Sequence, residues 1–165
     1  FYLTIFNPYD PFKGADDLAG VVEEAPYPIV WCHSQATKKA QDMPASLSDH
    51  PNIIHIDDPT PEEMRYLYER CKAYLSFSRW EGFGWAIADA LRYARVIVSR
   101  PVGVLSYPES QQLDGVHLLG DEWTVDWSAL PDLPQVQIPR ELLWVSPQRF
   151  RSTLAALADR SGVIS

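Results

Sequence analysis

Short apolar runs alternate along this chain with stretches of helical periodicity, and that alternation limits the folds it can adopt. Apolar runs bounded by Pro, Gly or Asp predict six strands, at Phe1–Phe6, Ile29–His33, Ile53–Ile56, Ala73–Phe77, Val96–Ser99 and Val116–Leu119. Helical periods predict helices at Ala15–Glu24, after Thr60, at about Phe83–Ala94 and at Pro147–Ala158. Strands that alternate with helices are typical of a three-layer α/β domain with a mostly parallel sheet.

The helix after Thr60 has the clearest start signal in the sequence. Thr60-Pro61-Glu62-Glu63 is a capping box with proline at the first helical position. The residues Met64, Leu67, Tyr68 and Cys71 follow at spacings of three and four. One face of this helix is therefore expected to pack on the sheet.

Size and charge narrow the range of partners. The chain has 165 residues, the size of one domain, and a net charge of −8. An acidic chain does not favour a nucleic-acid backbone as its partner. It contains no long apolar stretch for a membrane span and no signal peptide, which favours a soluble protein. It begins with Phe1 in an apolar run, which we interpret as the start of a piece of a longer protein.

Cysteine and histidine give no sign of a metal site. Cys32 and Cys71 lack CxxC spacing, and buried free thiols in a reducing cytoplasm are favoured over a disulfide. None of the four histidines has the partner spacing of a catalytic triad or a metal site.

Ligands of parallel sheets bind beyond the carboxyl ends of the strands, which directs attention to the loops that follow them. These loops are Asn7–Gly14, Asp57–Pro59, Ser78–Gly84 and Arg100–Pro108.

In Ser78–Gly84, two glycines let the backbone approach a ligand, and the following helix start suits an anion. Glu81 would repel phosphate but could accept hydrogen bonds from hydroxyls, and a nucleotide-linked sugar carries both groups. Taken alone, the loop favours a tight strand-to-helix turn in which Glu81 helps to cap the helix over a ligand site.

A longer pattern surrounds this loop. It runs Glu81-Gly-Phe-Gly-Trp-Ala-Ile-Ala-Asp89, then Val96–Ser99, Gly103, Pro108-Glu109 and Asp114-Gly115. The pattern resembles the C-terminal half of GT-B glycosyltransferases of the large retaining family 4, which carry an E-G-F-G stretch and a second acid eight positions after the first. Asn7–Gly14 and Ile56–Tyr68 resemble earlier parts of the same half. The resemblance covers residues 1–120 and implies a Rossmann-like donor-binding lobe.

The resemblance implies roles only for matching positions. Glu81 would contact donor-sugar hydroxyls and Lys13 would pair with the diphosphate, so these two are the candidate catalytic residues. Asp89 stands where the second acid, usually Glu, binds the ribose. The other expected donor-binding residues are Asn7, Arg79, Gly82, Phe83, Gly84, Trp85 and Arg100. We expect Trp85 to pack in the core, and Trp80 is equally suited to the core or to stacking on a ligand.

Two positions depart from the family pattern. Asn7 replaces a common arginine, so Arg79 or Arg100 would have to supply the missing positive charge. Asp57 replaces the usual glycine after the third strand, in a loop expected near the nucleotide base.

The resemblance implies transfer of a sugar from a nucleoside-diphosphate sugar to an acceptor hydroxyl with retention. We expect no metal and no cofactor beyond the donor substrate, because no Asp-x-Asp motif is present and lysine and backbone dipoles supply positive potential. An acceptor glycan or glycolipid would bind through a missing N-terminal domain, so the fragment alone is expected to be inactive.

The implied setting is polysaccharide biosynthesis in the cytoplasm, at the inner face of the membrane for the full enzyme. A non-catalytic nucleotide-sugar-binding or scaffold domain and a GT-B sugar-nucleotide epimerase remain alternatives.

Three regions are expected along the chain. Residues 1–120 form the donor-binding core, 121–146 form an irregular covering segment rich in Trp and Pro, and 147–165 add a C-terminal helix.

Overall fold

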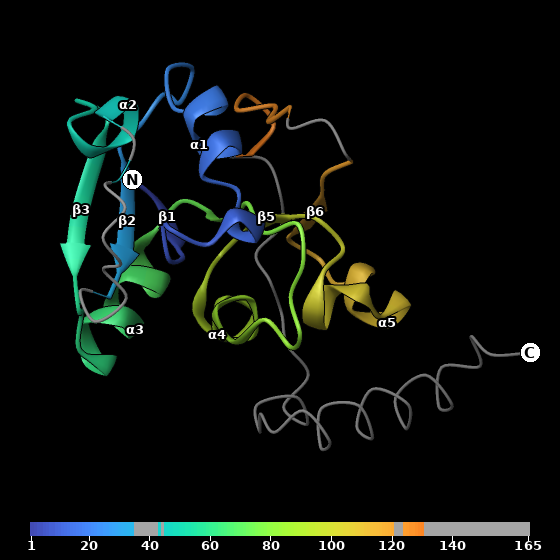
Figure 1. Cartoon of the computed structure of the whole chain (residues 1–165). Helices are drawn as coiled ribbons and strands as arrows, with labels where there is room; N and C mark the ends of the chain where they lie inside the picture. Colours follow the sequence, from blue (N-terminus) through green and yellow to red (C-terminus); the bar gives the residue numbers. More distant parts are fainter. Residues whose placement is uncertain (35–42, 44, 121–123, 131–165) are drawn as a thin grey trace, which may run out of the picture.

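The computed structural model describes residues 1–34, 43, 45–120 and 124–130. Within these ranges six parallel strands form one sheet in the order β3-β2-β1-β4-β5-β6 (Figure 1). The strands are β1 (Tyr2–Ile5), β2 (Ile29–His33), β3 (Ile53–Asp57), β4 (Tyr74–Ser76), β5 (Ile97–Ser99) and β6 (Val116–Leu118). Every predicted strand is confirmed, with ends within one residue of the predicted bounds.

Helices and short 3-10 turns connect the strands. They are η1 (Pro11–Lys13), α1 (Ala15–Val21), α2 (Ala45–Ser48), α3 (Pro61–Arg70), α4 (Trp85–Tyr93), η3 (Gly103–Ser106) and α5 (Pro108–Gln111). Helix α1 ends three residues before the predicted Glu24, and Pro108-Glu109 begins the short helix α5. The predicted helix at Pro147–Ala158 lies outside the described residues, as does the predicted covering segment apart from 124–130.

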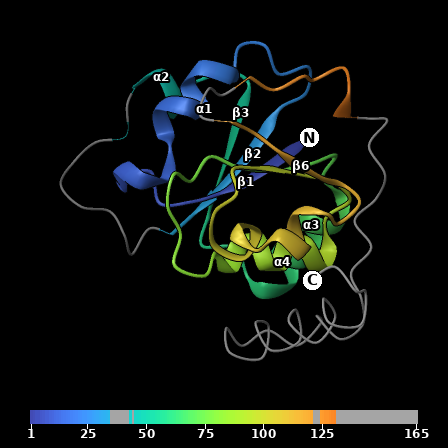
Figure 2. The ribbon, with the colours of Figure 1, turned by 90° about the vertical axis from the view of Figure 1, so that its right-hand side faces the viewer.

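Successive residues of each strand point to opposite faces of the sheet, and each face carries its own apolar cluster. On β1, Tyr2 packs with Leu18 and Val21 of α1, while Leu3 packs with residues of α3 and α4. Figures 1 and 2 show α1 and α2 on one side of the sheet and α3, α4 and α5 on the other. The three-layer α/β Rossmann-like fold is thus confirmed.

Helix α3 follows the sequence signal closely. The Thr60 side chain accepts from the Glu63 backbone N–H (3.2 Å), and the Glu63 carboxylate accepts from the Thr60 N–H (2.7 Å). Tyr68 and Cys71 are buried against the sheet, with Met64 and Leu67 packed around them. The predicted capping box and packing face are both confirmed.

Both cysteines are buried free thiols, as predicted. Burial raises the pKa of each thiol, Cys32 and Cys71, to about 12. Neither is a reactive thiolate near neutral pH. In the part of the chain that the structure describes, no helix is long and apolar enough to cross a bilayer.

The strand order reverses between β1 and β4. Chain connections run from β1 outward to β2 and β3 on one side, and from β4 outward to β5 and β6 on the other. The loops that leave β1 and β4 therefore diverge at the carboxyl edge of the sheet, and this is where α/β proteins bind their ligands.

Candidate functional site

The loops after β1 and β4 touch through their backbones. Gly14 ends η1 with a φ of 76°, and a Cβ at this position would lie 2.2 Å from the Phe77 carbonyl oxygen. The Arg79 N–H donates to the Phe12 carbonyl (2.8 Å). Only glycine allows this approach and this φ, so Gly14 holds the two loops together.

This contact brings the two candidate catalytic residues together. Lys13 Nζ donates to Glu81 Oε1 at 2.5 Å, and the Ser78 hydroxyl donates to the same oxygen at 2.7 Å. The side chains of Lys13 and Glu81 are only 23% and 16% exposed, so solvent screens their attraction weakly. Neither of these contacts is with α4. Glu81 therefore does not act as a cap of that helix.

Helix α4 begins directly after this acid. Gly84 is its N-cap, with a φ of 78° and no side-chain hydrogen bond to the first turn. Positive potential at a helix start without a side-chain cap suits an anion. Gly82 has no atom within 4 Å of an added Cβ, which leaves open space beside the loop.

A second glycine packs closely against the loop that carries Glu81. Gly103 has a φ of 56°, and an added Cβ would lie 2.5 Å from the Phe83 carbonyl oxygen. The Val104 N–H donates to that same oxygen (2.8 Å). Turn η3 therefore fixes the backbone of the loop that carries Glu81.

The two predicted donor-binding arginines meet on Asp17. Arg79 makes two hydrogen bonds to the Asp17 carboxylate, each 3.1 Å, and Arg100 makes one of 3.2 Å. Asp17 raises the pKa of the Arg79 guanidinium, chiefly through these hydrogen bonds. Arg100 is 9% exposed, whereas the Arg79 side chain is half exposed. Both arginines thus lie near the site with a carboxylate as partner.

Asn7 and the loop after β3 share a hollow of about 320 Å³. Asn7 Oδ1 accepts from the Tyr9 N–H (3.0 Å). Asp57, the position expected to replace a glycine, ends β3 and lies 2.9 Å from His33 Nδ1. The left-handed residue is its neighbour Asp58, with a φ of 47°. The unusual backbone of this loop therefore lies one residue after the position that the sequence singled out.

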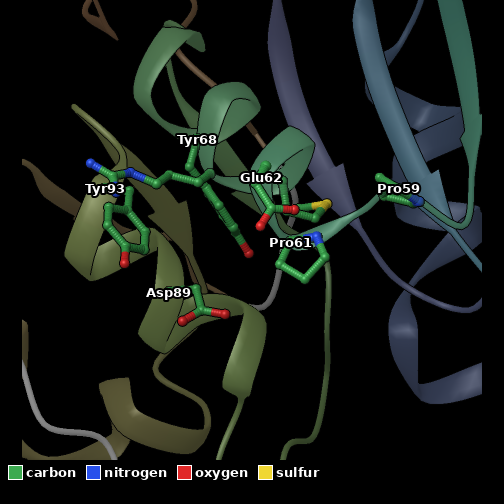
Figure 3. Close-up of a pocket in the computed structure, with 8 residues that line it drawn as sticks. Pro59, Pro61, Glu62, Tyr68, Asp89 and Tyr93 are labelled. Atoms are coloured by element: carbon green, nitrogen blue, oxygen red, sulfur yellow. The ribbon is translucent and has the colours of Figure 1, made fainter.

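Asp89 lines a separate hollow of about 560 Å³ between α3 and α4 (Figure 3). Burial raises the pKa of its carboxyl group, and nearby Arg92 partly opposes that shift. The Tyr68 hydroxyl, which faces the same space in Figure 3, donates to the Ala86 carbonyl (2.9 Å). The hollows that contain Asp89 and Asn7 share Pro59 and Met64, so they are neighbours. Lys13 and Glu81 line neither of them.

Aromatic side chains are exposed around the loops. Trp80 is 66% exposed, Trp85 54% and Phe12 58%. The prediction that Trp85 packs in the core is wrong, because it is the first residue of α4 and the buried face of that helix begins at Ile87. Its ring instead contacts Phe83 edge-on, at 4.7 Å between centroids.

The histidines form contacts that spacing alone did not suggest. His33 Nε2 lies 3.2 Å from His55 Nδ1, and His55 Nε2 lies 3.1 Å from the Leu47 carbonyl. Among the described residues, no three His, Cys, Asp or Glu side chains are grouped to hold a metal ion.

Sequence reasoning missed Asp17 and Ser78. Ser78 lies three residues before Glu81, a spacing that could have drawn attention. Asp17 lies 62 and 83 residues from its partners, and nothing local predicts those contacts.

The fold belongs to the α/β Rossmann-like class, and solved glycosyltransferases share it. Three solved structures of two proteins are similar to this chain. AviGT4, a glycosyltransferase involved in avilamycin A biosynthesis, matches 97% of this chain with a TM-score of 0.57 and 16% identity. Anabaena HepE, solved with UDP and glucose, matches 97% with a TM-score of 0.59 and 13% identity. HepE with UDP-glucose matches 80% with a TM-score of 0.55 and 17% identity.

These similarities show a shared fold. The match covers 49% of the AviGT4 chain and 44% and 37% of the two HepE chains, so this chain spans less than half of their length. No family model matches the sequence, and no curated protein matches it.

Proposed function

We propose that this chain is the nucleotide-sugar donor-binding lobe of a retaining GT-B glycosyltransferase of family 4, its C-terminal half. The observation that carries the proposal is the Lys13–Glu81 pair at the strand-order reversal, beside the N-terminus of α4. A cation, an acid and a helix start in one place match the diphosphate and the sugar hydroxyls of such a donor.

The charges suggest how the donor binds. The diphosphate attracts Lys13 away from Glu81 and accepts hydrogen bonds from the backbone at Gly84 and Trp85. Glu81, still held by Ser78, is then able to accept hydrogen bonds from sugar hydroxyls. Asp89 contacts the ribose in the hollow between α3 and α4, and burial of its carboxyl favours a partner that donates hydrogen bonds.

Transfer breaks the bond between the anomeric carbon and the diphosphate oxygen, and the diphosphate leaves with the electron pair. The acceptor oxygen forms the new bond on the same face, and its proton passes to the departing phosphate or to water. Lys13 and the start of α4 stabilise the leaving charge, so the reaction needs no metal. A purified full-length enzyme is expected to keep its transfer activity when a chelator is added.

Transfer requires residues outside this chain. The matched structures are about twice as long, so we place the acceptor, a glycan or glycolipid, in the rest of the protein. The chain alone should bind donor without turnover. We propose cytoplasmic polysaccharide assembly as the setting.

A binding-only role is the second candidate. It is favoured by Asn7, which hydrogen-bonds within its own loop and adds no charge, and by the engagement of Arg79 with Asp17. Transfer by the full-length enzyme from UDP-glucose would exclude this candidate.

Calorimetry with UDP-glucose and other nucleotide sugars tests donor binding. Lys13→Ala and Glu81→Gln should each weaken binding about tenfold or more. Lys72→Ala and Glu24→Gln are matched controls, because Lys72 pairs with Tyr27 away from the loops and Glu24 is exposed after α1. Absence of binding to every nucleotide sugar would refute the proposal.

A further inference from the structure

Asp17 accepts three hydrogen bonds from two arginines beside the site. It lies in the first turn of α1, four residues after Lys13, and its side chain is 15% exposed. Oδ1 accepts from Arg79 Nη2, and Oδ2 accepts from Arg79 Nε and from Arg100 Nη1. Charge-assisted bonds of this kind, with one arginine bound through two atoms, are strong and directional.

These bonds join three segments that follow three different strands. Asp17 belongs to α1 after β1, Arg79 to the loop after β4, and Arg100 to the loop after β5. Arg100 Nη1 also donates to the Phe77 carbonyl (3.3 Å), the atom against which Gly14 packs. Because Arg79 lies two residues before Glu81, the position of this acid relative to Lys13 depends on the same contacts.

The contacts also engage the charged end of a half-exposed arginine. The Arg79 side chain is 48% exposed, and its guanidinium hydrogen-bonds to Asp17 through both Nε and Nη2. Without the carboxylate, the guanidinium would turn to the strongest anion in reach, the diphosphate. It would bind a bare nucleoside diphosphate more strongly than its sugar ester, since the bare compound carries one more negative charge.

We infer that Asp17 is a positioning residue that makes the site selective for sugar-bearing nucleotides, by holding Arg79 off the diphosphate and by fixing the loop that carries Glu81. The inference rests on the proposed function and adds to it a basis for selectivity. It also assigns Arg79 a structural role in place of the expected contact with phosphate.

The test is the ratio of the dissociation constants for UDP and UDP-glucose. Asp17→Asn should tighten UDP binding and lower this ratio about fivefold. Asp16→Asn is the matched control, because it removes the same charge from the same turn of α1. Asp16 is exposed and makes no hydrogen bond to either arginine. In this control the ratio should stay within about twofold of the wild type. The double variant Asp17→Asn/Arg79→Gln should lose the gain in UDP affinity.

Arg79→Gln alone keeps the inference testable if Asp17→Asn does not fold. It should change UDP affinity by less than about twofold, whereas a loss of about tenfold or more would make Arg79 a phosphate ligand and overturn the inference. An unchanged ratio in Asp17→Asn would also overturn it, and the proposed function would stand as long as the wild type binds UDP-glucose and Glu81→Gln binds it more weakly. If the wild type binds neither ligand, the proposed function fails, and the inference fails with it.

Discussion

Glu81 accepts a hydrogen bond of 2.5 Å from Lys13, a residue 68 positions earlier in the chain. The acid and the cation are paired in a place where both are mostly shielded from water. A donor would exchange this pair for two new interactions, one with phosphate and one with hydroxyls. The pair is therefore expected to couple the two ends of the donor.

The first prediction concerns this coupling. In a double-mutant cycle for UDP-glucose binding, Lys13→Ala and Glu81→Gln should be non-additive by about 1–2 kcal/mol, because either change alone leaves the other group without its partner. Calorimetry on the four proteins measures it. Pairing Lys72→Ala with Glu81→Gln as a control should give additive effects, and additivity of the Lys13 cycle would mean that the two residues act independently.

The second prediction uses the open space at Gly82. An added Cβ there meets no protein atom within 4 Å, so Gly82→Ala should change the free energy of unfolding by less than about 0.5 kcal/mol. UDP-glucose binding should weaken about tenfold, because a methyl group would occupy space next to the ligand. Gly20→Ala, equally unobstructed but on α1, should leave binding intact. Normal binding by Gly82→Ala would show that the donor does not approach this backbone.

The third prediction concerns the support of the loop by Gly103. Gly103→Ala places a methyl group 2.5 Å from the Phe83 carbonyl oxygen at a φ of 56°, and should destabilise the fold by about 2–3 kcal/mol. Chemical denaturation measures this value. Gly120→Ala, where an added Cβ meets nothing, should stay within about 0.5 kcal/mol of the wild type. Equal stability of the two variants would contradict the close contact.

The fourth prediction is a pH dependence from Asp89. Burial raises the pKa of this carboxyl above its ordinary value, so the folded state binds the proton more tightly than the unfolded state. The free energy of unfolding should therefore fall as pH rises from the unfolded pKa through the raised folded pKa. Asp89→Asn should remove this part of the slope when denaturation is compared between about pH 4 and about pH 7.

The same shift has the opposite consequence for binding. If the Asp89 carboxylate accepts from the ribose, UDP affinity should fall as pH drops through the raised pKa, because the protonated group is a poorer acceptor. Asp89→Asn should bind UDP weakly with no such dependence. An identical pH profile in wild type and variant would place the ribose elsewhere.

Local patterns account for much of the secondary structure. Six apolar runs became six strands, and Thr60 with Glu63 formed the predicted capping box, because these signals act between residues close in sequence. Trp85 was assigned wrongly for a related reason. The sequence shows that the residue is apolar. Its position as the first residue of α4, before the buried face begins, depends on how that helix packs on the sheet.

The sequence by itself determined the parallel sheet, the loops at its carboxyl edge and the E-G-F-G turn with its acid, since spacing and residue type are enough to specify these. Only the tertiary structure decided which charges meet. Lys13 reaches Glu81 because the strand order brings β1 beside β4. One Asp17 carboxylate engages both Arg79 and Arg100 because the start of α1 meets the loops after β4 and β5 there. Such pairings follow from strand order and backbone packing across distant segments, which local sequence does not encode.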